Sequence, residues 1–209
     1  MGGISVDEKA EMTLKERRIA HIQVEIPGLL KHKTILYIGA KIKKRWGKGN
    51  EMLPLFVDAG YKIDIVEVFE QNYNALQHFN QNGRNFLGGR VEAGAFRNII
   101  HGNVLDLDIL EGLDPEGYDV TMFWHGPEHL DLPDLRPTIQ RLEERAKHLS
   151  ILGCPFGVYH QAAVNGNEWE IHRSALYPIY FERLGYTVAT LGRRDEKKSH
   201  ITAWKRKEQ

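Results

Sequence analysis

Short apolar runs recur along the chain, separated by longer stretches of mixed polar and apolar residues. The first run is apolar at almost every position, which is typical of a strand buried on both faces of a sheet. The last two runs alternate better, as strands with one exposed face do. The runs that predict strands are TILYIG (34–39), IDIVEV (63–68), RNIIHG (97–102), YDVTMFW (118–124), HLSILGC (148–154), YTVATLG (186–192) and HITAWKR (200–206).

The stretches between these runs have the spacing of helices. The clearest one has apolar residues at every third or fourth position, which places them on one helical face. Pro137 lies near its start, where a missing amide does no harm. The residues of this stripe are Leu135, Ile139, Leu142, Ala146 and Leu149. Further helices are expected at 54–61, 70–79 and 178–186, with an amphipathic leader helix within 13–26.

The order of these elements predicts the fold class. Strands that alternate with helices form a mostly parallel sheet with right-handed crossovers. Only a short polar segment (193–199) joins the last two strands, so we expect the last strand to be antiparallel. The sequence therefore predicts an α/β fold, a Rossmann-like doubly wound seven-stranded sheet. Residues 1–30 are expected to form a tail and the leader helix, and residues 31–209 one domain.

Composition and charge narrow the class of protein. With 209 residues, of which 42% are hydrophobic, the chain is long enough for one domain with a buried core. The 28 basic residues are balanced by 28 acidic ones, which does not favour capture of nucleic acid by overall charge. The single cysteine, Cys154, argues against a disulfide framework. We expect a cytoplasmic protein with no membrane span and no secretory leader.

Residues that follow the apolar runs are the candidates for chemistry, because doubly wound sheets bind ligands at the carboxyl ends of their strands. Gly39 permits a tight turn and close approach of a ligand. Glu67 stands where nucleoside-binding sheets place an acid that accepts hydrogen bonds from ribose. Asn103 and Val104 would face the edge of a purine ring. The structural alternatives are an ordinary turn glycine and an exposed glutamate at a strand end.

These segments together resemble the class I S-adenosylmethionine-dependent methyltransferases over about residues 31 to 206. The resemblance rests on ILYIGA, IVEV, IIHGNVLDL, YDVTMFWHGPEHL and the closing strand pair. In that family the first glycine turn meets the methionine part, the acid after the second strand holds the ribose, and the third strand end meets adenine. The residues implied to bind S-adenosylmethionine are Gly39, Ala40, Lys41, Glu67, Val68, Asn103, Val104 and Trp124.

Two features depart from the family pattern. Lys41 and Lys43 stand where small residues usually follow the first glycine, and Asn103 replaces a frequent aspartate. A lysine near the methionine carboxylate would help binding, whereas one beside the sulfonium would hinder it. Alternatively, the basic segment 41–50 with Trp46 holds a phosphate-bearing partner, or it is a solvated insert.

The segment WHGPEHL (124–130) is the densest polar cluster in the sequence. It matches the zinc-protease spacing H-x-x-E-H, but Gly126 and Pro127 favour a turn, so its histidines are not expected on one helical face. No histidine spacing demands a metal, and none is predicted. The candidate catalytic residues, which would orient the methyl acceptor or take its proton, are His125, Glu128 and His129. The alternative is that they brace the turn.

The segment 155–174 is long and carries several aromatic and polar residues, including His160 and His172. Loops of this length are usually functional, and we expect this one to close over the pocket as a lid. The sequence thus predicts a methyltransferase with an unassigned acceptor. The second prediction is a non-catalytic Rossmann-like module that holds a phosphate-rich partner or nucleic acid with its basic loop.

Overall fold

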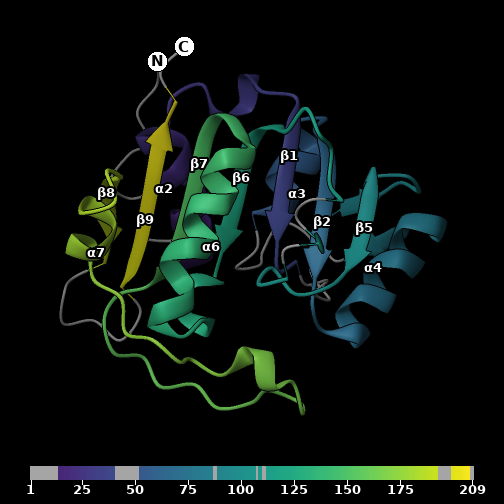
Figure 1. Ribbon diagram of the computed structural model, residues 1–209. Coiled ribbons are helices and arrows are strands. Elements are labelled where there is room, and N and C mark those ends of the chain that lie inside the picture. Colours follow the sequence, from purple (N-terminus) through teal and green to yellow (C-terminus); the bar gives the residue numbers. More distant parts are fainter. Residues whose placement is uncertain are drawn as a thin grey trace.

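A seven-stranded sheet with helices on both faces forms the molecule (Figure 1). The computed structural model describes residues 14–40, 52–86, 89–106, 108–109, 112–192 and 199–207. The strands of the sheet are β1 (Thr34–Ile38), β2 (Lys62–Glu67), β5 (Asn98–His101), β6 (Tyr118–Trp124), β7 (Ala146–Pro155), β8 (Thr187–Leu191) and β9 (His200–Arg206). Apart from small shifts of their ends, these are the strands that the sequence predicts.

The helices lie between the strands in the predicted order. The α-helices are α2 (Leu14–Glu25), α3 (Leu53–Asp58), α4 (Glu70–Asn82), α6 (Leu132–Arg145) and α7 (Pro178–Glu182). The 3-10 helices are η1 (Leu29–Lys31), η2 (Pro127–His129) and η3 (Glu168–Glu170). In the part of the chain that the structure describes, no helix combines the length and the apolar character that crossing a membrane requires.

The strand order β5-β2-β1-β6-β7-β9-β8 is that of a doubly wound sheet. β1 pairs in parallel with β2 and β6, β2 pairs with β5, and β6 pairs with β7. β9 runs antiparallel to both β7 and β8, which confirms the prediction for the last strand. Because the chain leaves β1 toward β2 and β5 and then returns to β6 on the other side, the switch point lies between β1 and β6.

The two faces of the sheet are covered by different helices, because neighbouring side chains of a strand point to opposite faces. Ile35 and Tyr37 of β1 belong to a core cluster that includes residues of α2, α3 and α4. Leu36 and Ile38 belong to a second cluster, which includes residues of α6 and α7. The predicted leader helix is confirmed as α2, whose buried Ile22 packs in the first of these clusters.

One predicted helix is wrong at its C-terminal end. Helix α6 ends at Arg145, and Ala146 begins β7 directly, so Leu149 lies in a strand and not on the helical stripe. At Ala146 and Leu149 the apolar spacing is compatible with a helix and with a strand. Pairing of β7 with β6 decides the outcome, because Ala146 lies opposite Tyr118 and Leu149 opposite Val120.

A short hairpin of β3 (Arg84–Phe86) and β4 (Gly89–Val91) was not predicted. Strands this short offer too few positions for an alternating pattern to be recognised. The helix expected at 178–186 is also shorter than predicted, because α7 ends at Glu182 and turns follow up to Gly185.

The carboxyl ends of the parallel strands meet at one edge of the sheet, and the long segment after β7 lies there. In Figure 1 the arrowheads of β1, β2, β5 and β6 point toward the lower edge, and the segment between β7 and α7, drawn in green, extends beyond it. The fold therefore brings this segment to the edge at which doubly wound sheets bind ligands.

Candidate active site

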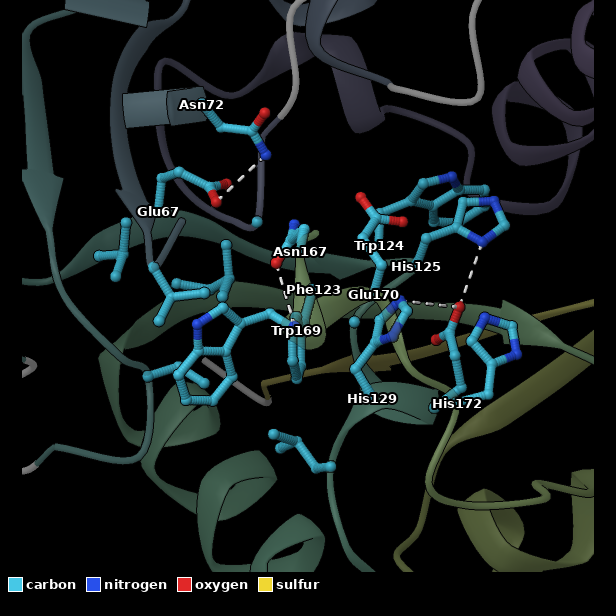
Figure 2. A pocket seen from close by; sticks show the side chains of 18 of the residues that line it. Glu67, Asn72, Phe123, Trp124, His125, His129, Asn167, Trp169, Glu170 and His172 are labelled. Carbon is cyan, nitrogen blue, oxygen red and sulfur yellow. Dashed lines mark hydrogen bonds and ion pairs between the residues drawn. The ribbon is translucent and has the colours of Figure 1, made fainter. Parts of the chain in front are cut away.

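A cavity of about 270 Å³ opens at the carboxyl edge, bordered by the ends of β1 and β6. Its volume lies near the lower end of the range for small-molecule sites, roughly 300–1,000 Å³. In the view of Figure 2, Glu67 and Asn72 lie at one end of it and His125, His129 and His172 at the other. We call these parts the Glu67 end (Gly39, Glu67, Val68, Asn72, Asn103 and Val104) and the histidine end (Arg18, His125, Glu128, His129 and His172).

Gly39 forms the turn directly after β1. Its φ of 76° lies in the left-handed region that favours glycine, and its amide donates to the carbonyl of Val66 at 2.9 Å. A Cβ built on Gly39 would meet no heavy atom of the described residues within 4 Å. The turn therefore leaves open space beside the cavity. Ala40, in contrast, is buried in the core and does not line the cavity, and Lys41 lies outside the described residues.

Glu67 is the last residue of β2. The residue is only 4% exposed, yet it lines the cavity. Its Oε1 accepts a hydrogen bond from the amide of Phe69 at 2.9 Å and one from the Asn72 side chain at 3.4 Å. Helix α4 begins at Glu70, so these donors come from the turn and the first residues of the helix that follow β2. The carboxylate is thereby held in one orientation at the edge of the cavity.

Asn103 and Val104 follow β5 and complete the Glu67 end. The Oδ1 of Asn103 accepts from the amide of Leu105 at 3.0 Å, so this oxygen shapes the turn. Val104 is buried and belongs to the core cluster that contains Ile38 and Val66. This part of the cavity therefore combines a polar turn with an apolar wall, which suits a flat ring with polar edges.

The chain turns sharply after β6, and this turn begins the histidine end. His125 has a φ of 52°, which is uncommon outside glycine and occurs often at functional sites. Gly126 follows, and a Cβ there would lie 1.8 Å from the ring of Phe123, so only glycine fits. The helix η2 then starts at Pro127. His125 thus lies before the helix, which confirms that the two histidines of the H-x-x-E-H spacing do not share one helical face.

A chain of hydrogen bonds links Arg18, His125 and Glu128. Nη1 of Arg18 lies 3.1 Å from Nε2 of His125, and Nδ1 of His125 lies 3.3 Å from Oε1 of Glu128. A guanidinium only donates, so Nε2 of His125 accepts and Nδ1 carries the proton that faces the carboxylate. The leader helix α2 therefore fixes the tautomer of a histidine in the cavity wall.

Glu128 is 2% exposed, and burial raises the pKa of its carboxyl, while the nearby His129, His172 and Arg18 act to lower it. Its main-chain carbonyl accepts from the amides of Arg173 and Ser174 at 2.8 and 3.1 Å. Because these amides belong to the long segment 155–174, the segment is tied to η2 beside the cavity.

The segment 155–174 lines the cavity, as the lid prediction requires. Asn167, Trp169 and His172 are among its lining residues, and Oδ1 of Asn167 accepts from the amide of Trp169 at 3.0 Å. His160 is exposed and is not among the lining residues. Of the two histidines singled out in this segment, the fold therefore brings only His172 to the site.

Among the lining residues that were not singled out from the sequence are Arg18, Asn72 and Trp169, the last of which lies in the predicted lid segment. Arg18 did leave a trace in the sequence, because it precedes Ile22 and Ile26 at helical spacing and so places a cation on the apolar face of the leader helix. Trp169 belongs to the aromatic residues for which the segment 155–174 was singled out, whereas no sequence pattern indicated Asn72. Trp124, which was predicted, lines the cavity while 2% exposed, and its indole packs against His200 with ring centres 4.5 Å apart.

Comparison with known proteins is informative at the level of structure. No protein-family model matches the sequence, and no curated protein matches it. The chain is similar to magnesium protoporphyrin IX methyltransferase from Synechocystis PCC 6803, with a TM-score of 0.58 and 12% identity over 100% of this chain and 90% of that one. It is also similar to a SAM-dependent methyltransferase from Archaeoglobus fulgidus, with a TM-score of 0.56 and 17% identity over 95% and 97% of the two chains.

A third similar structure is an O-methyltransferase family protein from Burkholderia thailandensis, with a TM-score of 0.54 and 14% identity. This chain spans only 57% of its length. The strand order and these similarities together show that the chain has the Rossmann-like fold of the class I methyltransferases.

Proposed function

We propose that the protein is an S-adenosylmethionine-dependent methyltransferase. The observation that carries the proposal is that the turn at Gly39, the carboxylate of Glu67 and the segment Asn103–Val104 border one cavity at the switch point of the sheet. The similar methyltransferase from Synechocystis PCC 6803 was solved both with SAH and with SAM bound.

The residues at the Glu67 end suit such a cofactor. A Cβ on Gly39 would fill open space at the cavity, so glycine leaves room there for a close approach of the methionine part. Glu67 holds a buried carboxylate at the place where hydrogen bonds from ribose hydroxyls are expected. Val104 offers an apolar wall to adenine. Lys41, the residue expected near the methionine carboxylate, lies outside the described residues and stays a prediction.

When bound, S-adenosylmethionine supplies an activated methyl group. The work of the chain is then to hold the acceptor in line with that group and to exclude water. His125, Glu128 and His129 line the opposite end of the cavity, within reach of an acceptor placed between the two ends. Residues of segment 155–174, His172 among them, also line the cavity. Proton removal from the acceptor would fall to Glu128 or His129.

The direct test is calorimetric titration of the purified protein with S-adenosylmethionine and S-adenosylhomocysteine. We expect Glu67→Ala to weaken binding of both at least tenfold, because a hydrogen bond to a charged group contributes about 1.5–3 kcal/mol. The matched control is Glu70→Ala, since Glu70 lies three positions further on and is exposed. Glu70→Ala should bind like the wild-type protein.

Either of two results would contradict the proposal. The first is that the wild-type protein binds neither ligand. The second is that a folded Glu67→Ala variant binds both ligands as tightly as the wild-type protein does. The second prediction, a non-catalytic module, depends on the segment 41–50, which lies outside the described residues. It would gain support if cofactor binding failed while RNA or DNA bound with an affinity that falls steeply as salt rises.

A further inference from the structure

Three side chains at the histidine end have the composition of a metal site. They are Glu128 and His129 of η2 and His172 of the long segment after β7. One ligand atom from each lies within 4.8 Å of the other two, and all three residues line the cavity. Figure 2 shows the two histidines on the same side of the cavity, and their ring centres are 4.9 Å apart.

The tautomers of both histidines follow from their hydrogen bonds. Nδ1 of His129 lies 3.1 Å from the carbonyl oxygen of Ile171, and Nδ1 of His172 lies 2.6 Å from that of Tyr159. A carbonyl oxygen only accepts, so Nδ1 is the donor in each ring and Nε2 of the neutral ring carries a lone pair. Metal-binding histidines usually have this arrangement, in which a backbone carbonyl holds the ring nitrogen that does not bind the metal.

The carboxylate of Glu128 provides an independent observation. Its Oε1 accepts from His125, and it also lies 3.9 Å from Nε2 of His129, so two acceptor atoms face each other. Its Oε2 is buried and has no hydrogen-bond partner among the described residues. A buried, ionised carboxylate oxygen without a partner is strongly unfavourable, and either protonation of the carboxyl or a bound cation relieves it.

We propose that Glu128, His129 and His172 bind a divalent transition-metal ion of the zinc type. Two imidazoles and one carboxylate are the donor set of many catalytic zinc sites, whereas Mg²⁺ and Ca²⁺ prefer oxygen ligands alone. This site departs from the expectation that no metal is bound. That expectation considered spacing along the sequence, and the third ligand comes from a separate segment that only the fold brings to η2.

Binding requires a modest closure of the site. Ligands at about 2.0–2.2 Å from one ion lie roughly 3–3.5 Å from one another. The three side chains therefore move together by an ångström or more, which draws the segment that carries His172 toward η2. Three protein ligands leave at least one coordination position open, and the site lines the cavity. If the proposed methyltransfer is correct, an oxygen or nitrogen atom of the acceptor can fill that position and be activated for proton loss. With the metal bound, Glu128 and His129 are ligands and not bases, so the proton passes to water.

Zinc titration of chelator-treated, tag-free protein tests the site without any need for cofactor or acceptor. We expect one Zn²⁺ to bind per chain, and Co²⁺ to give the visible absorption bands of a site with nitrogen and oxygen ligands. The variants Glu128→Gln and His172→Gln should each weaken Zn²⁺ binding roughly 100-fold, since even outer-shell changes reduce metal affinity 10–100-fold. Glu128→Gln keeps the shape of the side chain and removes a buried charge, so it should remain folded.

The matched control is His160→Gln, because His160 lies in the same segment but is exposed and does not line the cavity. It should bind Zn²⁺ like the wild-type protein. Absence of stoichiometric binding, or equal weakening in all three variants, would overturn the metal site. The two proposals fail separately: loss of cofactor binding with Zn²⁺ binding intact removes the methyltransferase assignment alone, and the reverse result removes the metal alone.

Discussion

The two ends of the cavity are built in different ways. The Glu67 end consists of the short turns that directly follow β1, β2 and β5 and of the first turn of α4, and the carboxylate of Glu67 is oriented by donors within five residues of it. The histidine end combines α2, the turn after β6 and the segment 155–174, with a hydrogen bond between Arg18 and His125 that spans 107 positions. The first end is a property of the sheet, whereas the second exists only when distant segments are packed together.

Disturbing the sheet beneath the Glu67 end should have the largest effect. Asp64 of β2 accepts hydrogen bonds from Arg97 at 2.7 and 2.8 Å and from the hydroxyl of Tyr118 at 2.7 Å. We expect Asp64→Asn to lower the free energy of unfolding by about 2 kcal/mol, because it leaves a partly buried cation with weaker partners. Asp114→Asn, which changes the more exposed partner of Arg97, should lower it by less than about 1 kcal/mol.

The same carboxylate predicts a pH dependence. Burial acts to raise the pKa of Asp64, but hydrogen bonds from Arg97, Tyr118 and Asn98 outweigh it and hold the pKa below its ordinary value. A lowered pKa stabilises the fold above the unfolded value of about 3.9, and this contribution disappears as pH falls through the folded value. Chemical denaturation at several pH values should show a smaller loss on acidification for Asp64→Asn. If the free energy of unfolding fell equally with acidification in Asp64→Asn and in the wild-type protein, this prediction would be contradicted.

Hydrogen exchange would show whether the disturbance is local. In Asp64→Asn the amides of β5, which pairs with β2 and forms an edge of the sheet in the described part of the chain, should exchange faster than in the wild-type protein. Amides of β7 beneath the histidine end should change less. If amide exchange became equally faster in β5 and β7, the disturbance would not be local to the Glu67 end, which would contradict the difference between the two ends.

A substitution at Gly39 should affect the Glu67 end alone. We expect Gly39→Ala to reduce stability by about 1–2 kcal/mol, because alanine is strained at a positive φ, and to weaken S-adenosylmethionine binding at least tenfold. Gly94→Ala is the matched control, since Gly94 has a φ of 77° and similar open space but does not line the cavity. It should lose similar stability and keep full cofactor affinity in calorimetry. Equal loss of affinity in both variants would mean that strain, and not the cavity, is responsible.

The smallest expected effect lies at the histidine end. Arg18→Met keeps the length of a buried side chain, so stability should change by less than about 1 kcal/mol. His125 loses the donor that fixes its tautomer, and nitrogen chemical shifts of its ring should move toward a mixture of tautomers. Arg17→Met changes an exposed neighbour and should leave these shifts unaltered. A His125 spectrum unaffected by Arg18→Met would show that α2 does not act on this ring.

The difference between the two ends also explains what the sequence could predict. The seven strands and the lining positions of Gly39, Glu67 and Asn103 follow from apolar runs and from the residues next to them. Arg18 and His172 belong to segments that meet the β6 turn only after folding, so no local spacing reveals their association. The end of α6 was missed because Ala146 and Leu149 are apolar in a strand as well as in a helix.

The direct passage from α6 into β7 gives the domain a rigid joint. Arg145 is the last helical residue and Ala146 is the first residue of the strand, so no loop residue separates the two elements. One extra residue at this joint would turn every side chain of the strand to the opposite face. It would also displace Gly153, whose missing side chain makes room for the indole of Trp124. Length changes during evolution should therefore be excluded from this joint and accumulate in the segments between other elements.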